Sequence, residues 1–410
     1  MCVTEVEKTI FLGRDVTVRT SLDRPGDSLV ITFTSRRQGP KIDRAGFGAD
    51  FFAKRGIPAV HFVSLRNHWW QTAEMEAALQ AVENLDLRSR FSGITAYGSS
   101  MGGHGALIFS ERLQADRVLA FSPQFALHGR NASWNSVWAK ETEDLTELYR
   151  LEDGCSQVAN ILVVVDPTRK FDMVHVNAIQ SHRDIRVLRI PFGAHPPMRY
   201  LNDQRLLAPL AEGMVFGTFN FQKFRHLVRS DRRRNLRYLL GIARRLHRRK
   251  STTGTQSILK TAISEIKHRI AAGEPITTPA DAATLITMAY SRKTLDLEGA
   301  LSLIEQLSAL FPTVSHIHAA HAQLLLQSPN PTTAVASAKR ALKLNRKNLE
   351  LRLGLAHTLF AVGRIEEGRD TVLAALNIPE RNITTWRRFL SIHAPYLDNA
   401  TFQSVQQRIQ

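Results

Sequence analysis

Short apolar runs alternate with helical patterns over the first 216 residues, and this alternation restricts the chain to few folds. The runs are rich in β-branched residues and nearly continuous, which is typical of parallel strands buried on both faces. Apolar residues at helical spacing separate them, at Ala73–Leu85, Gly102–Ala115 and Val174–His182. This order predicts a doubly wound, mostly parallel α/β sheet. The predicted strands are Ser28–Thr34, Pro58–Ser64, Gly93–Gly98, Arg117–Ser122, Ile161–Val165 and Ile185–Phe192, with antiparallel edge strands within residues 4–12 and 15–21.

The chain has 410 residues, more than one ordinary core accommodates, so we expect several units. Residues 1–216 form the predicted sheet unit. Within it, residues 124–159 interrupt the alternation and are longer than a normal connection between strands. Insertions of this length often form caps over a functional site, so we expect a cap insertion here. Residues 217–255 are predicted to be a basic amphipathic linker helix, and residues 256–410 an all-α domain.

The positive charge is concentrated in the predicted linker. The formal net charge is +17, yet residues 1–216 carry 25 Lys and Arg against 24 Asp and Glu, while residues 217–250 carry 12 against one. Within residues 230–250 the leucines fall on one helical face. This segment could bind an anionic membrane, bind a polyanion by charge alone, or join two domains with its leucines packed on the sheet unit. We favour the third interpretation, because so wide an apolar stripe needs burial and no pattern of interleaved aromatic residues marks a nucleic-acid platform.

The segment Gly98–Ser99–Ser100–Met101–Gly102 matches the pattern G-x-S-x-G. A predicted strand precedes it and a helical pattern follows, so the serine would lie on a tight strand-to-helix turn with glycines allowing close packing. We expect Ser100 to be a nucleophile and the backbone N–H of Met101 to stabilise an oxyanion. A second oxyanion donor is expected after the strand Ser28–Thr34, near Ser35.

Two aspartates and then a histidine follow later predicted strands. Asp166 and Asp172 come after Ile161–Val165, and His195 comes after Ile185–Phe192. With Ser100, this order resembles the α/β-hydrolase superfamily over residues 1–216. The resemblance implies a Ser-His-Asp triad. Asp166 is preferred as the acid because it directly follows the strand; Asp172 is the alternative, although it could instead cap the next helix.

Trp69 and Trp70 follow another strand on the side expected to hold the site. They could line a substrate pocket, or they could simply pack in the core. No histidine has metal-ligand spacing with a cysteine or an acidic residue, so we predict no metal and no cofactor.

The C-terminal helices repeat with a period of 34 residues. Similar segments begin at Glu298, Thr332 and Glu366, and small residues recur in register at Ala300, Ala334 and Gly368. Over about residues 281–380 this pattern resembles the tetratricopeptide repeat. The resemblance implies stacked helix pairs with a curved surface that binds another protein.

Together these features predict a serine hydrolase that cleaves an ester, thioester or amide substrate through an acyl-enzyme. Two alternatives remain open: an acyltransferase that uses the same triad, and a non-catalytic adaptor that binds a protein or an anionic surface through its repeats and basic helix. The N-terminus lacks a secretory pattern and no apolar run is long enough to span a bilayer, so we expect a cytoplasmic protein.

Overall fold

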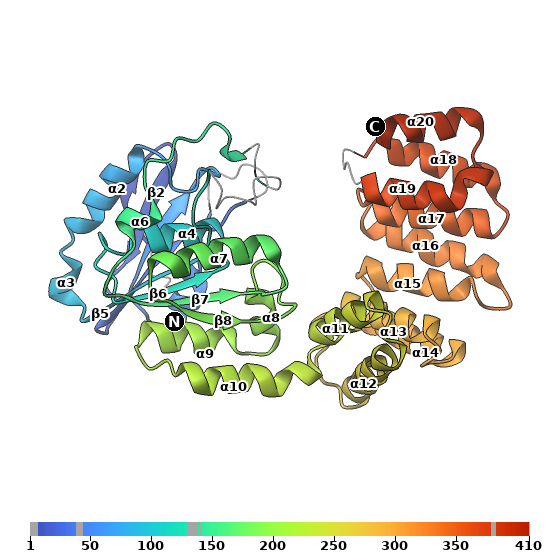
Figure 1. The fold of residues 1–410 in the computed structure, drawn as a ribbon, viewed down its shortest axis with the longest axis horizontal. Helices are drawn as coiled ribbons and strands as arrows, with labels where there is room; N and C mark the ends of the chain where they lie inside the picture. Colours follow the sequence, from blue (N-terminus) through green and yellow to red (C-terminus); the bar gives the residue numbers. More distant parts are fainter. Residues whose placement is uncertain (1–6, 38–43, 129–137, 139–140, 379–382, 410) are drawn as a thin grey trace. The chain divides into compact units, whose positions relative to one another are not determined.

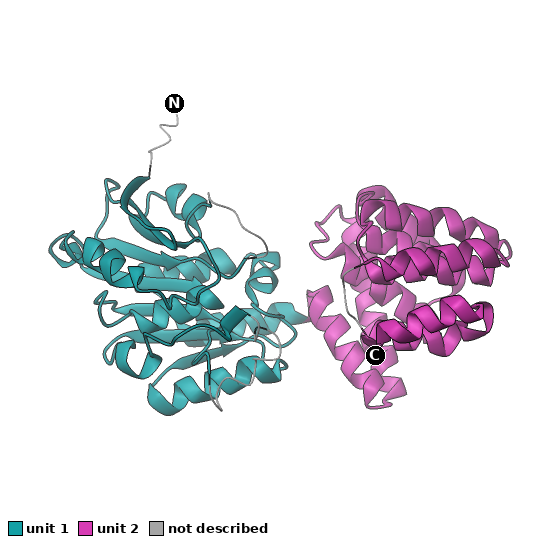
Figure 2. Cartoon of the chain, turned by 90° about the horizontal axis from the view of Figure 1, so that it is seen from above, with its two compact units in different colours: residues 1–232 teal, residues 233–410 magenta. Residues whose placement is uncertain are grey.

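The computed structural model describes residues 7–37, 44–128, 138, 141–378 and 383–409. The chain divides into two compact units, residues 1–232 and residues 233–410 (Figures 1 and 2). The boundary falls inside the segment that the sequence predicts to be a linker helix. Within the described residues, no helix combines the length and apolar content needed to cross a membrane.

The first unit is built on an eight-stranded sheet in the order β1-β2-β4-β3-β5-β6-β7-β8. β2 is antiparallel to both β1 and β4, and the strands from β4 to β8 are parallel to one another. The fold class predicted from the sequence is therefore confirmed. The strands are β1 (Lys8–Leu12), β2 (Val16–Ser21), β3 (Ser28–Phe33), β4 (Ala59–Ser64), β5 (Gly93–Ser99), β6 (Arg117–Phe121), β7 (Asn160–Val165) and β8 (Arg186–Arg189).

Helices cover both faces of the sheet (Figure 1). Alternate residues of β3 share a core with α2 (Glu74–Glu83), α4 (Met101–Ile108) and α7 (Lys170–His182). On the opposite face, α9 (Leu207–Val215) packs on β3, β5 and β6, and α1 (Ala49–Ala53) packs on β4. Burial on both faces explains why these strands are continuous apolar runs. The remaining short helices of this unit are α3 (Leu87–Arg90), α6 (Leu151–Gly154) and α8 (Met198–Asp203).

The predicted cap insertion, residues 124–159, is described only in part, because residues 129–137 and 139–140 lie outside the described residues. Beyond Thr142 the insertion forms turns and irregular chain up to α6. The side-chain oxygen of Gln71 accepts hydrogen bonds from the N–H groups of Leu148 and Tyr149, both at 2.8 Å. The insertion is thereby attached to the loop that follows β4.

The basic segment is two helices and not one. α10 (Phe221–Asp231) is followed by a 3-10 turn (Arg232–Arg234) and by α11 (Leu236–Arg248), which Asn235 caps by accepting a hydrogen bond from the N–H of Tyr238. The apolar face of α11 packs on α12 (Thr252–Ala271) and α13 (Pro279–Ser291). Our expectation that these leucines pack on the sheet unit was therefore wrong. They belong to the helical unit; they are Leu236, Leu239 and Leu240.

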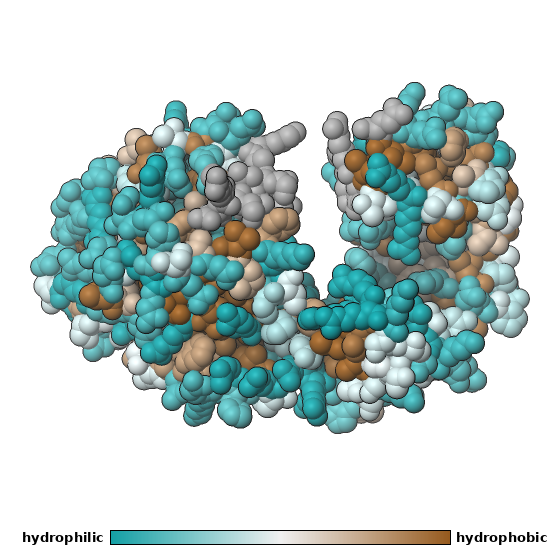
Figure 3. Space-filling view, viewed as in Figure 1, coloured by the Kyte–Doolittle hydropathy of each residue, from teal (hydrophilic) through white to brown (hydrophobic). Residues whose placement is uncertain are grey.

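The outer surface of α11 is strongly hydrophilic (Figure 3). Its exposed cations lie in the second half of the helix and just beyond it: Arg244, Arg245, Arg248, Arg249 and Lys250. Because the apolar face is already covered within the unit, α11 cannot insert that face into a bilayer without unpacking. Binding of an anionic surface by charge alone stays a prediction.

The second unit consists of paired helices. Ala300, Ala334 and Gly368, which recur every 34 residues, are all buried. A Cβ at Gly368 would collide with the ring of Phe360, so a larger residue here would have to displace that ring. Besides α11, α12 and α13, the helices are α14 (Leu297–Leu310), α15 (Ser315–Leu325), α16 (Ala334–Leu344), α17 (Leu349–Ala361), α18 (Ile365–Leu376), α19 (Ile383–His393) and α20 (Asn399–Ile409), with 3-10 turns at Pro331–Thr333 and Ala394–Tyr396.

Candidate active site

Ser100 lies at the sharp turn between β5 and α4, in the middle of the parallel sheet. Its backbone has φ 53° and ψ −119°, a conformation that non-glycine residues rarely adopt. The turn is tight because a Cβ at Gly98 would collide with the carbonyl of Gly102, and a Cβ at Gly102 would collide with the carbonyl of Phe33. The two glycines of the motif therefore allow the helix to approach both its own strand and β3.

The loops at the carboxyl ends of the strands bring three polar side chains into one hydrogen-bonded series. The Oγ of Ser100 lies 3.0 Å from Nε2 of His195, and Nδ1 of His195 lies 2.8 Å from Oδ2 of Asp172. Ser100 is 7% and Asp172 8% exposed, so the series is largely withdrawn from water. Asp172 is in the first turn of α7, and His195 is in the loop between β8 and α8.

Asp166 lies elsewhere in the same region and has different partners. One carboxylate oxygen accepts hydrogen bonds from the N–H and hydroxyl of Thr168 and from the N–H of Phe192, and the other accepts from the N–H of Ala194 at 3.0 Å. All of these donors belong to the loops after β7 and β8. The preference for Asp166 as the partner of His195 is therefore corrected: Asp172 contacts the ring, and Asp166 holds the loop that carries it.

Both predicted oxyanion donors lie near Ser100. Met101 is the first residue of α4, where backbone N–H groups have no acceptor within the helix. Ser35 follows β3, whose Phe33 pairs with Gly98 of β5, so the chain beyond Phe33 passes beside the turn of Ser100. The Nη2 of Arg44 donates to the carbonyl oxygen of Ser35 at 2.7 Å and fixes that part of the loop.

The two tryptophans are buried and do not form an open pocket wall. Both have no exposed surface. The indole N–H of Trp70 donates to the carbonyl of Met101 at 2.9 Å, while that of Trp69 donates to Oε1 of Gln124 at 3.3 Å. Of the two interpretations of these side chains, the structure matches the one in which they pack in the core. They support the backbone and the side chains around Ser100.

Gln124 was not singled out in the sequence. Its Nε2 lies 3.5 Å from the Oγ of Ser100, and it follows β6 at the same edge of the sheet as the other site residues. Its position shortly after a strand that neighbours β5 is a signal that could have identified it.

Left-handed backbone conformations concentrate at this edge of the sheet. Each such non-glycine residue costs of the order of 1 kcal/mol, so a cluster indicates loops held by their surroundings. The residues with positive φ in the loops after β4, β5, β6 and β8 are Trp69, Trp70, Ser100, Ser122, Phe192 and Ala194.

Two buried histidines lie behind the series. His104, in α4, places Nδ1 3.0 Å from the carbonyl oxygen of Gln124, and burial lowers its pKa to about 4. His175, in α7, accepts a hydrogen bond from the N–H of Phe125 at 3.1 Å, and burial with the nearby His104 lowers its pKa to about 3. Both rings are therefore neutral at pH 7, and His175 packs as an uncharged group near Asp172 and His195.

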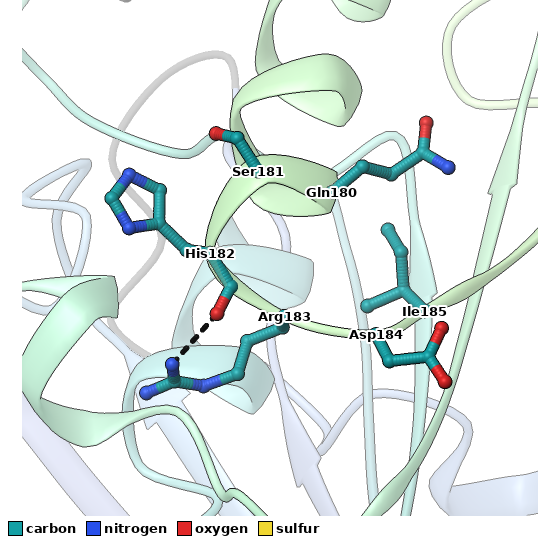
Figure 4. Close-up of a pocket in the computed structure, with 6 residues that line it drawn as sticks. All are labelled: Gln180, Ser181, His182, Arg183, Asp184 and Ile185. Carbon is teal, nitrogen blue, oxygen red and sulfur yellow. Dashed lines mark hydrogen bonds between the residues drawn. The ribbon is translucent and has the colours of Figure 1, made fainter.

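A separate surface pocket of about 400 Å³ lies between α7 and β8 (Figure 4). Arg183 is one of the residues that line it, and its Nη1 donates to the carbonyl oxygen of His182 at 2.8 Å. Because the chain between α7 and β8 leads into the amino end of β8, the pocket is at the edge of the sheet opposite to Ser100.

The described residues contain no group of three or more His, Cys, Asp or Glu side chains placed to hold a metal ion. The chemistry of the site is accordingly derived from its own side chains and backbone.

A comparison with protein-family models matches residues 325–384 to a tetratricopeptide repeat. This match lies within the region whose 34-residue period was identified in the sequence, and it confirms the repeat there. Binding of a protein by these repeats stays a prediction.

Similar solved structures cover one unit or the other at low sequence identity. A capsule O-acetyltransferase of Neisseria meningitidis serogroup A is 14% identical, over 44% of this chain and 85% of its own, with a TM-score of 0.35. An α/β serine hydrolase without a lid from Xanthomonas campestris is 14% identical, over 55% and 94%, with a TM-score of 0.31. A tetratricopeptide repeat protein of Thermus thermophilus is 18% identical, over 45% and 96%, with a TM-score of 0.32. No curated protein matches the sequence.

Proposed function

We propose that the chain is a serine hydrolase that cleaves an acyl ester, thioester or amide through an acyl-enzyme on Ser100. The observation that carries this proposal is the series from Ser100 through His195 to Asp172, with distances of 3.0 and 2.8 Å. A hydroxyl, an imidazole and a carboxylate in this order form the arrangement that activates a serine. The left-handed turn at Ser100 supports the same conclusion.

Each group has a defined role in the proposed reaction. The Oγ of Ser100 attacks the carbonyl carbon while its proton passes to Nε2 of His195. Asp172 holds the Nδ1–H of the ring and stabilises the imidazolium. The negative oxygen of the tetrahedral intermediate accepts hydrogen bonds from the N–H of Met101 and a donor near Ser35. His195 then returns the proton to the leaving group, and a water molecule activated by the same ring releases the acyl group.

A fluorophosphonate probe tests the proposal, because it reacts with activated serines. The wild type should be labelled and Ser100→Ala should not. Ser99→Ala is the matched control: Ser99 is adjacent and buried, yet its hydroxyl has no partner among the described residues. Labelling of Ser100→Ala at the wild-type rate, or no labelling of a folded wild type, would overturn the proposal.

Turnover of simple esters distinguishes hydrolysis from acyl transfer. A hydrolase should release acid and alcohol in equal amounts with water as the only acceptor. If an ester acylates Ser100 but turnover requires an added alcohol or amine, the acyltransferase alternative replaces hydrolysis.

A further inference from the structure

Three arginines belong to the chain between β3 and α1, whose first residues pass beside the turn of Ser100. Gly102, two residues after Ser100, packs so closely on β3 that a Cβ there would lie 3.1 Å from the carbonyl carbon of Thr34. Ser35 therefore adjoins the start of α4. Arg44 returns to this point and donates to the Ser35 carbonyl at 2.7 Å, and Arg36 and Arg37 follow directly in the chain.

Arg36 is fully neutralised by its surroundings. Its guanidinium forms a two-pronged ion pair with the carboxylate of Glu141, with Nε at 2.7 Å from Oε2. It also stacks on the ring of Trp138, 4.3 Å from the centroid. Arg36 thus connects the β3 loop to the insertion and has little capacity left for a ligand.

Arg37 and Arg44 differ from Arg36 in their partners. Neither forms an ion pair with a carboxylate within the described residues, and Nη1 of Arg37 is buried there without a hydrogen-bond acceptor. The backbone of Arg37 is held on both sides by the amide of Asn67, at 2.9 and 2.8 Å, so its position is fixed. Burial and the nearby charge of Arg37 lower the pKa of Arg44 to about 10. Both side chains are therefore half-buried and near enough to repel each other, and neither is paired with a carboxylate among the described residues.

A partly buried guanidinium group without a carboxylate partner is costly unless an anion completes it. Guanidinium groups match phosphate and carboxylate oxygens with paired, charge-assisted hydrogen bonds. We propose that Arg37 and Arg44 form an anion-binding subsite beside Ser100, which receives a phosphate or carboxylate group carried by the acyl substrate. The proposal rests on the function proposed above and narrows its substrate class to anionic acyl compounds.

Matched pairs of esters test the subsite. Mono-4-nitrophenyl succinate carries a carboxylate on the acyl group, and its methyl ester is the neutral counterpart. On the leaving-group side, 4-acetoxyphenyl phosphate is compared with 4-acetoxyanisole. For at least one of these pairs, the kcat/KM of the wild type should be tenfold or more higher for the charged ester than for the neutral one. The difference should come chiefly from a lower KM. The pair that shows the preference identifies the side of the substrate that carries the anion.

Arg37→Gln and Arg44→Gln should each reduce this preference at least fivefold. Because the measured quantity is the ratio of the kcat/KM values of two esters, a general loss of activity cancels. Arg14→Gln is the control: its side chain is 84% exposed and Arg14 precedes β2, so the preference should not change. Equal rates for both members of both pairs, or an unchanged ratio in Arg37→Gln, would overturn the subsite.

A binding measurement separates failure of the subsite from failure of the proposed function. Phenyl phosphate should protect Ser100 from a neutral fluorophosphonate in the wild type, and at least fivefold less well in Arg37→Gln. If the probe labels Ser100 but phenyl phosphate gives no protection, the subsite is wrong and the hydrolase stands. If the probe never labels Ser100, the hydrolase is wrong, and the subsite is judged by whether phenyl phosphate raises the melting temperature of the wild type more than that of Arg37→Gln.

Discussion

At the scale of single residues, two aspartates after β7 position His195 in different ways. Asp172 contacts the imidazole, while Asp166 accepts four hydrogen bonds from the loops after β7 and β8. Substitution of Asp172 should therefore affect mainly activity, and substitution of Asp166 mainly stability.

Asp172→Asn should lower kcat by a factor between about 10² and 10⁴ with little change in melting temperature, because the amide no longer holds the catalytic tautomer or stabilises the imidazolium. Asp166→Asn should instead lower the free energy of unfolding by about 1–3 kcal/mol, since its amide nitrogen faces the N–H groups that the carboxylate accepts. Ester turnover and urea denaturation of both variants measure this. Equal losses of kcat in the two variants would contradict the assignment of Asp172.

His104 should make the stability of the sheet unit sensitive to acid. Its pKa is about 4 in the folded chain against an ordinary value of 6.5, so the unfolded chain binds more protons between these pH values. The free energy of unfolding should therefore fall as the pH drops from 6.5 to 4, by up to about 3 kcal/mol for this residue.

His104→Asn removes the titrating group and should flatten this dependence, measured by urea denaturation at pH 7 and pH 4.5. His61, whose pKa burial also lowers to about 4, and His175 act in the same direction, so the difference between variant and wild type isolates His104. The exposed His226 provides a control in His226→Asn. Identical pH dependence in His104→Asn and wild type would disagree with a buried neutral ring.

The G-x-S-x-G spacing and the order of strands were sufficient to predict that Ser100 and His195 lie at one edge of the sheet, where their side chains are 3.0 Å apart. They were insufficient to choose between Asp166 and Asp172, since both follow β7. The choice depends on how the chain turns at Thr168, whose N–H and hydroxyl draw Asp166 into a local turn. Gln124 follows a strand that neighbours β5, but its contact with Ser100 depends on tertiary structure that the sequence pattern does not specify.

At the scale of elements, the contact between α4 and β3 determines how closely Ser100 approaches the loop that follows β3. Gly102→Ala should lower the free energy of unfolding by about 1–3 kcal/mol or more, because the added methyl collides with the carbonyl of Phe33, a backbone group that cannot move alone. Tryptophan fluorescence during urea denaturation reports on this unit, which contains Trp69 and Trp70.

Gly354→Ala is the matched control in an open helical position. Gly354 lies inside α17 and no atom lies within 4 Å of an added Cβ, so alanine should stabilise the helix by about 0.5–1 kcal/mol. Stabilisation by both substitutions would show that α4 does not pack as tightly on β3 as described.

Periodicity predicted the existence of most elements, but tertiary contacts set several of their boundaries. The pattern at Gly102–Ala115 predicts a helix, yet α4 ends at Ile108 and the chain continues in turns. The leucine stripe of α11 was identified correctly as a face to be buried. Its partner could not be deduced, because α12 offers an equally suitable apolar surface.

At the scale of the whole molecule, every residue of the candidate site belongs to the first unit, residues 1–232. A chain shortened after Arg232 should therefore fold and hydrolyse small esters with a kcat within about threefold of the full chain. Fluorophosphonate labelling and ester turnover of the two chains test this. A shortened chain that shows the circular dichroism of a folded α/β unit but reacts more than tenfold slower would mean that the helical repeats contribute to catalysis.

The hydrogen bonds of the two buried indoles provide a spectroscopic reporter of the reaction. Trp69 donates to Gln124, which lies beside the Oγ of Ser100, and Trp70 donates to the carbonyl of Met101. Indole emission depends on such polar contacts, so acylation of Ser100 should change the intrinsic fluorescence of the chain without any added dye. Stopped-flow fluorescence could then resolve formation of the acyl-enzyme from its breakdown, and Trp386, which lies in the other unit, would contribute a constant background.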